Sequence, residues 1–489
     1  MTSTSTPSEA VPAPNPGGTR PVRSPRRSPA DLPFRFADEA LARRLATERS
    51  EPDWLLLDRL AGAAAFAALP TESNQLYTPY IDLRGAVLDA VRPWIHTASA
   101  PVPGASAELP DGVDGVIDLR EDAVVALALS PAAVRAGVIL ETFGAALARD
   151  PDGFRADIEG GGSLPADDRL AQLARGFWSQ GVRLVVPARV RLAHPILVRW
   201  GSGNPGRALV SRTFVRLGVG AEASLVEEQV PSGAEVECAA GEIVPQGLFH
   251  GTIEVVLGTD ARLAVAAIQD LGSRQVAFQH RFARIGKGAS LHWAMAQLGS
   301  RLTRSRVDNR LEGDRSSVEQ VEIVFGTDEQ LFDLTSYTRH IGRDTTGNLL
   351  SKGALLDRAR SYMKGLITIE RSAVGTDSFL GEFGMNLSRA TRAVAIPSLE
   401  IDQPDCRRAA HSSSVGPIDP NQLFYLESRG IPPDEARKFI VLGFLEPVVA
   451  RVPLEAAQER LRELLEVKWA AGLAAGSDGV TGSAGGAAA

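Results

Sequence analysis

Cysteine is nearly absent from the chain, which has two, Cys238 and Cys406, among 489 residues. A secreted fold held together by disulfides needs a denser set of cysteines, so this count favours a reducing, cytoplasmic setting. Two thiols also fall short of a site built from four thiolates. Any metal centre of that kind would need ligands of another type or a second chain.

Long apolar runs and an excess of positive charge are missing as well. No segment approaches the roughly 18 consecutive apolar residues of a membrane-spanning helix. The 52 Lys and Arg residues stand against 59 Asp and Glu residues, a balance that gives no electrostatic footprint for nucleic acid or an anionic membrane. The sequence therefore predicts neither kind of partner.

The motifs of the common nucleotide-dependent and metal-dependent enzymes do not occur. The chain has no GxxxxGK[ST] phosphate loop and no GxSxG, HExxH or CxxC sequence. The adjacent acids Glu227 and Glu228 lie in an alternating stretch, where neighbouring side chains point to opposite faces of a strand. An exposed face is the preferred interpretation, and a glycosidase or lyase cleft is the alternative.

Composition and pattern divide the chain into five segments. Residues 1–33 predict a disordered polar tail, with a transit peptide as the alternative. Residues 34–165 predict a mainly helical region with a continuous helical run over 132–149 and a linker over 151–165. Three further segments follow, namely a strand-rich core (166–410) whose last strand ends near residue 401, a helical region (411–470) and a disordered Gly/Ala/Ser tail (471–489).

A repeat marks the strand-rich core. Four glycines are each followed five positions later by a leucine that opens a new strand, at Gly220, Gly258, Gly286 and Gly326. Recurring turns of this kind suit stacked coils of a β-solenoid, and a β-sandwich with ordinary glycine turns is the alternative. Helical regions on both sides of the strands favour the solenoid, because its two ends need caps.

Two helices are predicted in the region that follows the strands. Residues 433–446 are apolar, begin with Pro433 and acidic residues, and end before Pro447, which we expect to stop the helix. Residues 454–469 place their leucines and Trp469 on one face.

One short stretch combines metal-binding residue types. Cys406 and His411 lie five positions apart, and Arg407 and Arg408 between them favour the thiolate form of the cysteine. A site for a metal or for sulfur is one interpretation. A loop cysteine with a packed histidine is the other.

Several blocks resemble one family of known proteins. The block HSSSVGPIDPNQLFYLESRGI at 411–431 is similar to the SufB/SufD family, and so are the residues that continue it to Phe444. Upstream, GVRLVVPA at 181–188 resembles the family's entry into its β-helix. The sequence SEPDW at 50–54, with Arg59 and Phe66, resembles its amino-terminal helical motif. The resemblance covers about residues 35–470.

The resemblance implies a mainly β fold, namely a right-handed parallel β-helix with flanking N-terminal and C-terminal helical regions. It implies a non-catalytic scaffold subunit for iron–sulfur cluster assembly that works with a SufB-like subunit and a SufC-like ATPase. A homodimer in isolation is a further expectation. No cofactor is expected to bind stably to the chain alone, and a nascent iron–sulfur cluster is expected in the complex.

The same resemblance implies the site residues. His411 falls where SufD chains keep a histidine implicated in cluster formation, whereas Ala409 replaces the family's cysteine and leaves Cys406 as the available thiol. Pro420 stands where SufB chains carry a glutamate, which indicates the SufD type. The dock for the ATPase is expected on the helix around residue 440, at Phe439, Ile440, Leu442, Phe444 and Leu445, with plain packing of this helix as the alternative.

Two other functions stay open from the sequence. A β-helix enzyme that acts on polysaccharide would need an acid cluster on one face of the solenoid, and usually a secretion signal. A structural interaction module would need no cluster chemistry at all.

Overall fold

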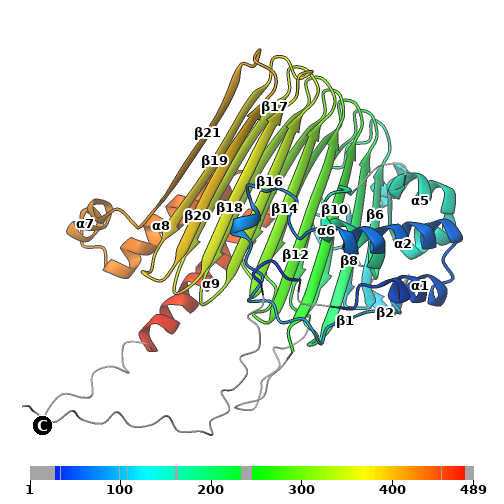
Figure 1. Ribbon diagram of the computed structural model, residues 1–489, viewed down its shortest axis with the longest axis horizontal. Coiled ribbons are helices and arrows are strands. Elements are labelled where there is room, and N and C mark those ends of the chain that lie inside the picture. The colour runs from blue at the N-terminus through cyan, green and yellow to red at the C-terminus, as the bar shows by residue number, and fades with distance from the viewer. Residues whose placement is uncertain are drawn as a thin grey trace, which may run out of the picture.

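Two facing sheets flanked by helices make up the molecule (Figure 1). The structure, a computed structural model, describes residues 28–32, 35–98, 100–106, 108–159, 164–232, 245–452 and 454–478. The predicted tail over 1–33, most of the predicted tail over 471–489, and Cys238 therefore lie wholly or largely outside the described residues. No helix in the described part of the chain is long and apolar enough to cross a membrane.

Sixteen strands form the central body. They are β6 (Gln180–Val186), β7 (Ile196–Gly201), β8 (Arg207–Leu217), β9 (Glu222–Val230), β10 (Gly247–Leu257), β11 (Arg262–Gln269), β12 (Gln275–Ile285), β13 (Ser290–Gln297), β14 (Leu302–Leu311), β15 (Ser317–Gly326), β16 (Leu331–His340), β17 (Thr346–Leu355), β18 (Arg360–Ile369), β19 (Asp377–Asn386), β20 (Arg392–Ile401) and β21 (Arg408–Gly416).

Consecutive strands of this body alternate between the two sheets. From β6 on, even-numbered strands lie in one sheet and odd-numbered strands in the other, and neighbours within each sheet are parallel. Each even–odd pair is thus one coil of a parallel β-solenoid, with about eight coils in all. The predicted solenoid is confirmed, and the sandwich alternative is wrong.

A column of residues with left-handed backbone forms one corner of the solenoid. Gly220, Asp260, Gly288, Asp344 and Gly375 have φ between 55° and 77°, and each donates its amide to a carbonyl in the corner of the next coil, at 2.8 to 2.9 Å. Of the four predicted glycine turns, those at residues 220, 258 and 286 lie at this corner, and the turn at residue 326 lies at another. Glycine suits such turns because a positive φ costs it little.

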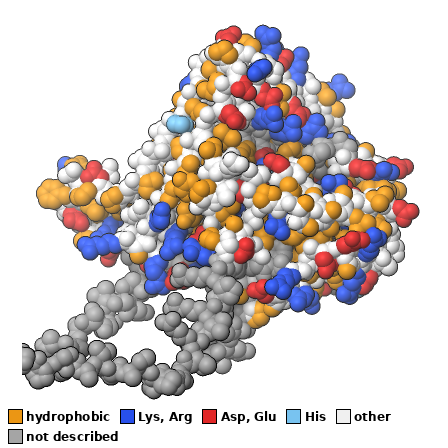
Figure 2. Space-filling view, viewed as in Figure 1, with side chains coloured by type: hydrophobic (Ala, Val, Ile, Leu, Met, Phe, Trp, Pro, Cys, Tyr) orange, Lys and Arg blue, Asp and Glu red, His pale blue; other side chains and the backbone are white. Residues whose placement is uncertain are grey.

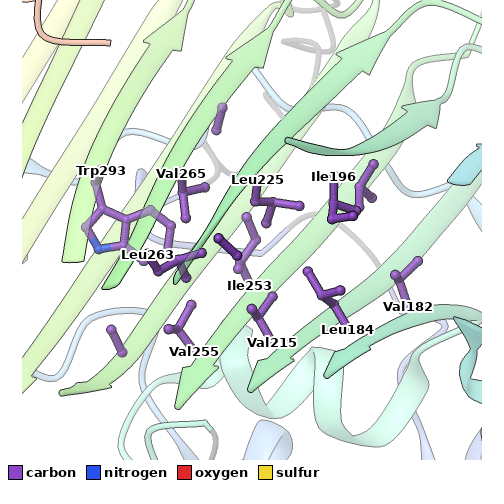
Figure 3. Packing of buried hydrophobic residues seen from close by; sticks show 14 of the residues in the cluster. Val182, Leu184, Ile196, Val215, Leu225, Ile253, Val255, Leu263, Val265 and Trp293 are labelled. Carbon is purple, nitrogen blue, oxygen red and sulfur yellow. The ribbon is translucent and has the colours of Figure 1, made fainter. Parts of the chain in front are cut away.

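Apolar side chains fill the space between the sheets. In-register residues of parallel strands point to the same side, so Leu225, Val265 and Trp293 form one inward column on β9, β11 and β13. Figure 3 shows these residues facing Val182, Leu184, Val215, Ile253 and Val255 of the even sheet.

The amino-terminal end is closed by short strands and helices. The strands are β1 (Arg92–Pro93), β2 (Pro101–Ser106), β3 (Gly115–Arg120), β4 (Ala123–Leu129) and β5 (Ile139–Thr142), and β3 with β4 and β5 with β6 pair antiparallel. Helices α1 (Glu39–Glu48), α2 (Asp53–Ala68) and α6 (Arg169–Phe177) lie near the start of the even sheet (Figure 1). A 3₁₀ turn lies at Thr78–Tyr80.

Two predictions for this region are wrong. The run over 132–149 is split into α3 (Pro131–Arg135) and α4 (Phe143–Arg149), because Gly137 has a positive φ and β5 intervenes. The expected linker from residue 151 begins instead with helix α5 (Pro151–Ile158), whose first turn is stabilised by the Asp150 carboxylate, which accepts the amide of Gly153.

Helices α7 (Pro420–Ser428), α8 (Pro433–Val449) and α9 (Glu455–Asp478) follow the last strand. Strand β21 runs to Gly416, so the strands continue past the expected end near residue 401. Pro447 lies inside α8 and does not stop it, because the buried Val448 and Val449 hold the last turn against the solenoid. Helix α9 reaches Asp478, beyond the expected end at Trp469.

Candidate functional site at the open end of the solenoid

The solenoid ends in two strands, β20 and β21, that have no neighbour on one side among the described residues. We call this surface the open end (Figure 1). His411 lies in β21, in register with the buried Leu380 of β19. Its side chain is therefore on the inward side of the sheet, yet it is exposed because no described strand covers it.

Cys406 lies in the turn between β20 and β21 and is partly buried. It packs against an apolar cluster of the last coils that contains Ile369 and Leu380. The strand from Arg408 to His411 alone spans about 10 Å, so the thiol and the imidazole sit at different points of the open end. The described residues contain no group of three His, Cys, Asp or Glu side chains that could hold a metal ion.

The two edges of the open end differ in their free hydrogen-bonding groups. In a parallel ladder the backbone amides and carbonyls of alternate residues bond to the inner neighbour. In both strands these are the even-numbered residues, as the amides of Arg392 and Arg408 show. The amides and carbonyls of the odd-numbered residues point outward, away from the solenoid. In β20 this row contains Pro397, which has no amide hydrogen, and Ala393, whose amide is bonded to the Asn386 side chain at 3.2 Å.

In β21 the outward row keeps every amide, at Ala409, His411, Ser413 and Val415. Unpaired amides and carbonyls on a sheet edge are a template for another strand, and proline on an edge blocks that pairing. The open end thus has one strand fit for extension, β21, and one that is blunted, β20. His411 lies within β21, the strand to which another strand can be added.

A buried carboxyl group lies one strand below this edge. Glu382 of β19 is in register with Ser413, and its carboxylate crosses to the other sheet, where it accepts the amide of Ile396 at 2.9 Å. Burial raises the pKa of Glu382 to about 7, although the Ile396 amide and the charge of Lys364 favour the ionised form.

The residues predicted to dock the ATPase lie on different faces of α8. Leu445 is buried, and Leu442 and Phe444 pack against the same apolar cluster on the outer face of the odd sheet. The side chain of Phe439, by contrast, is 61% exposed, and Ile440 lines a small apolar hollow shared with α7. Part of the predicted set therefore holds α8 in place, and part of it faces outward.

Helix α7 projects from the body and has no buried residue (Figure 1). Phe424 and Tyr425 are 73% and 57% exposed, and Figure 2 shows hydrophobic side chains over this projecting lobe. These two side chains belong to the block at 411–431 that resembles the family, but that resemblance did not place them on a surface. Two large aromatic residues in a helix without an amphipathic pattern were the available signal.

The two adjacent acids considered from the sequence have structural partners. Glu227 points inward to Arg281, with 3.1 Å between carboxylate and guanidinium, and burial raises its pKa. Glu228 points outward to Arg199 and to Arg460 of α9. The two face opposite sides as predicted but are both buried, so the expectation of an exposed face is wrong and they form no common cleft.

Three of the histidines are buried in the solenoid. His250 contacts the carbonyls of Leu170 and Phe278, His280 contacts Asp308 at 2.7 Å, and His340 contacts hydroxyl groups. These contacts give the three imidazoles a structural role.

The chain is similar in sequence to proteins of one known family. Residues 199–444 match the family model described as SUF system FeS cluster assembly, SufBD core domain. The iron–sulfur cluster assembly protein SufD of Bacillus subtilis (strain 168) is 28% identical over 385 residues, which are 76% of this chain and 86% of that protein.

Mycobacterial relatives give the same assignment. A SufBD family iron–sulfur cluster assembly protein of Mycobacterium tuberculosis is 29% identical over 314 residues, 63% of this chain and 75% of that protein. One from Mycobacterium leprae is 25% identical over 296 residues, 60% of this chain and 33% of that longer protein. The chain therefore belongs to the SufB/SufD family of the SUF iron–sulfur cluster assembly system, as a SufD-type member.

Proposed function

We propose that this chain is a non-catalytic scaffold subunit that assembles iron–sulfur clusters together with a SufB-like subunit and a SufC-like ATPase. The observation that carries the proposal is the open end, where His411 lies in β21, a long edge strand whose outward amides are all available to another chain. The family membership supports the cluster chemistry, and the exposed edge supports a partner.

The SufB-like subunit docks by adding a strand to β21. Strand addition supplies main-chain hydrogen bonds and brings side chains of the partner beside the inward-facing His411. A neutral imidazole is a suitable iron ligand, and the thiolates that this chain lacks come from the partner. Cys406, in the adjoining turn, is the remaining thiol of this chain at that surface.

A homodimer is the expected state when the SufB-like subunit is missing. Antiparallel pairing of β21 with its copy, centred on Ser412, sets His411 opposite Ser413 and Ala409 opposite Val415. All four residues belong to the outward row, so each such pair forms two hydrogen bonds. The edge of β21 can therefore pair with the same edge of a second copy.

The ATPase docks on the exposed side of α7 and α8. Phe424, Tyr425, Phe439 and Ile440 supply aromatic and aliphatic anchors of the type that dominate interface energies. Leu442, Phe444 and Leu445 keep α8 on the solenoid, so force applied to α8 is transmitted to the coils next to the open end.

Edge pairing is tested with proline at matched outward positions. Ser413→Pro removes one free amide of β21, and Ala395→Pro removes one from the blunted β20. In co-expression with SufB-like and SufC-like subunits, Ser413→Pro should lose the SufB-like subunit on purification, whereas Ala395→Pro should keep it. Equal retention in both variants would contradict docking through β21.

The site and the dock are tested in the same complex. His411→Ala should lower the iron and sulfide content of the anaerobically purified complex without releasing a subunit, and an unchanged content would remove His411 from the site. Phe439→Asp should release the ATPase. Val467→Asp, at a side chain of α9 that is 67% exposed, is its control and should not.

A further inference from the structure

Helix α9 is held to the solenoid by a narrow apolar face. Leu461, Leu465 and Trp469 are buried against the odd sheet. The Trp469 ring stacks on Phe325, with 6.3 Å between the ring centroids. The backbone at Gly472 comes so close that a Cβ there would lie 3.0 Å from the Leu356 side chain.

Lys468 lies within this contact, and no carboxylate of the described residues forms an ion pair with it. Lys468 donates to the carbonyl of Leu298 and, at 2.8 Å, to the side-chain oxygen of Gln330. Gln330 in turn donates to the carbonyls of Leu298 and Ser300, at 3.2 and 2.7 Å. The lysine thus completes a hydrogen-bonded cluster that joins two turns of the solenoid beneath α9.

Lys468 is partly buried under α9, and the charged groups around its ammonium do not offset the loss of contact with water. Asp270 and Asp328 act on it only as charges at a distance, and among the described residues neither forms an ion pair with it. Glu329, in the neighbouring turn, pairs with Arg301 and Arg358 instead. Burial therefore dominates and lowers the pKa of Lys468 to about 7.

We propose that α9 is a proton-sensitive latch, in which Lys468 loses a proton when the helix docks and regains one when the helix leaves the solenoid. In an undocked helix the lysine has a pKa near 10.4. The docked state therefore binds fewer protons, so docking strengthens as the pH rises from about 7 to about 10 and weakens toward neutral pH. Near pH 7 the docking of α9 on the solenoid is therefore close to its weakest.

Release of α9 would uncover apolar surface next to the ATPase dock. The contact covers Phe325, and α9 also pairs with α8 through Lys438 and Glu466. A loosened α9 frees α8 to move with a bound ATPase. This consequence rests on the proposed function, whereas the latch itself does not.

The test is hydrogen–deuterium exchange of the full chain over residues 455–472. With exchange corrected for intrinsic rates, protection of wild-type α9 should rise about eightfold from pH 7.5 to pH 8.5. Lys468→Met should remove this pH dependence and keep α9 protected at pH 7.5. Lys287→Met, which removes an exposed lysine at a corner of the solenoid, should behave like wild type.

Two results would overturn the latch. One is a wild-type protection that does not change with pH, and the other is an equal pH response in the Lys468→Met variant. If that variant does not fold, NMR titration of the Lys468 ammonium in the wild-type chain decides, because a pKa near 10 would refute the proposal. No readout uses a partner, so failure of the latch and failure of the proposed function are distinguishable.

Discussion

The crossing of α2 and α6 gives a sharp test of how closely the two helices pack. Gly62 and Gly176 let the two backbones meet, and a Cβ at Gly62 would lie 2.7 Å from the amide nitrogen of Gly176. Alanine in place of a mid-helix glycine normally stabilises by about 0.5–1 kcal/mol. Here a Cβ at position 62 would clash with backbone atoms, which cannot move aside as a flexible side chain can. The free-energy cost of this overpacking, about 3 kcal/mol, should therefore dominate. Gly62→Ala should therefore destabilise by about 2 kcal/mol.

Gly443 of α8 provides the matched control, because nothing lies within 4 Å of a Cβ placed there. Gly443→Ala should raise stability by about 0.5–1 kcal/mol. Urea unfolding followed by tryptophan fluorescence measures both variants, and hydrogen exchange of α2 and α6 locates the effect. If the two alanines shift the unfolding midpoint in the same direction, the reasoning from backbone contact is refuted.

Three further predictions concern the interior. Since the pKa of Glu382 is raised above its value of about 4.3 in an unfolded chain, its ionisation destabilises the fold as the pH rises from 4.3 to 7. Glu382→Gln keeps the acceptor for the Ile396 amide and should gain roughly 3 kcal/mol at pH 8 but little at pH 4, as urea unfolding at both pH values would show. Burial lowers the pKa of His340 to about 4, so stability should fall as the pH drops from 6.5 to 4, and His340→Gln should flatten that fall in the same titration. Ile253→Ala should cost about 2–5 kcal/mol, whereas Val134→Ala, at a side chain that is 59% exposed, should stay within about 0.5 kcal/mol in thermal unfolding.

The repeat and the alternating pattern pointed to a solenoid but left a sandwich open, because recurring glycine turns suit both folds. The flanking helical regions favoured the solenoid, and the family resemblance implied it. The splitting of 132–149 was not predictable from apolar spacing alone. There the pairing of β5 with β6, a contact between distant parts of the chain, overrides helix propensity.

The candidate site was predictable only in part. The resemblance selected His411 and Cys406, yet it could not show that the histidine lies within a strand or that the thiol packs against the core. Residue type and spacing carry no information on which amides of an edge strand point outward. That information depends on the register of β20 and β21 with their inner neighbours.

The antiparallel pairs β3–β4 and β5–β6 have a consequence for assembly. They close the first coils with strands of four to seven residues, whereas the opposite edge has strands of nine and ten. A chain with a long free edge at both ends would stack head to tail into a filament, because such contacts never close. Among the described residues the long free edge lies at one end only, so two chains that met there would leave no third position and growth would stop at a pair.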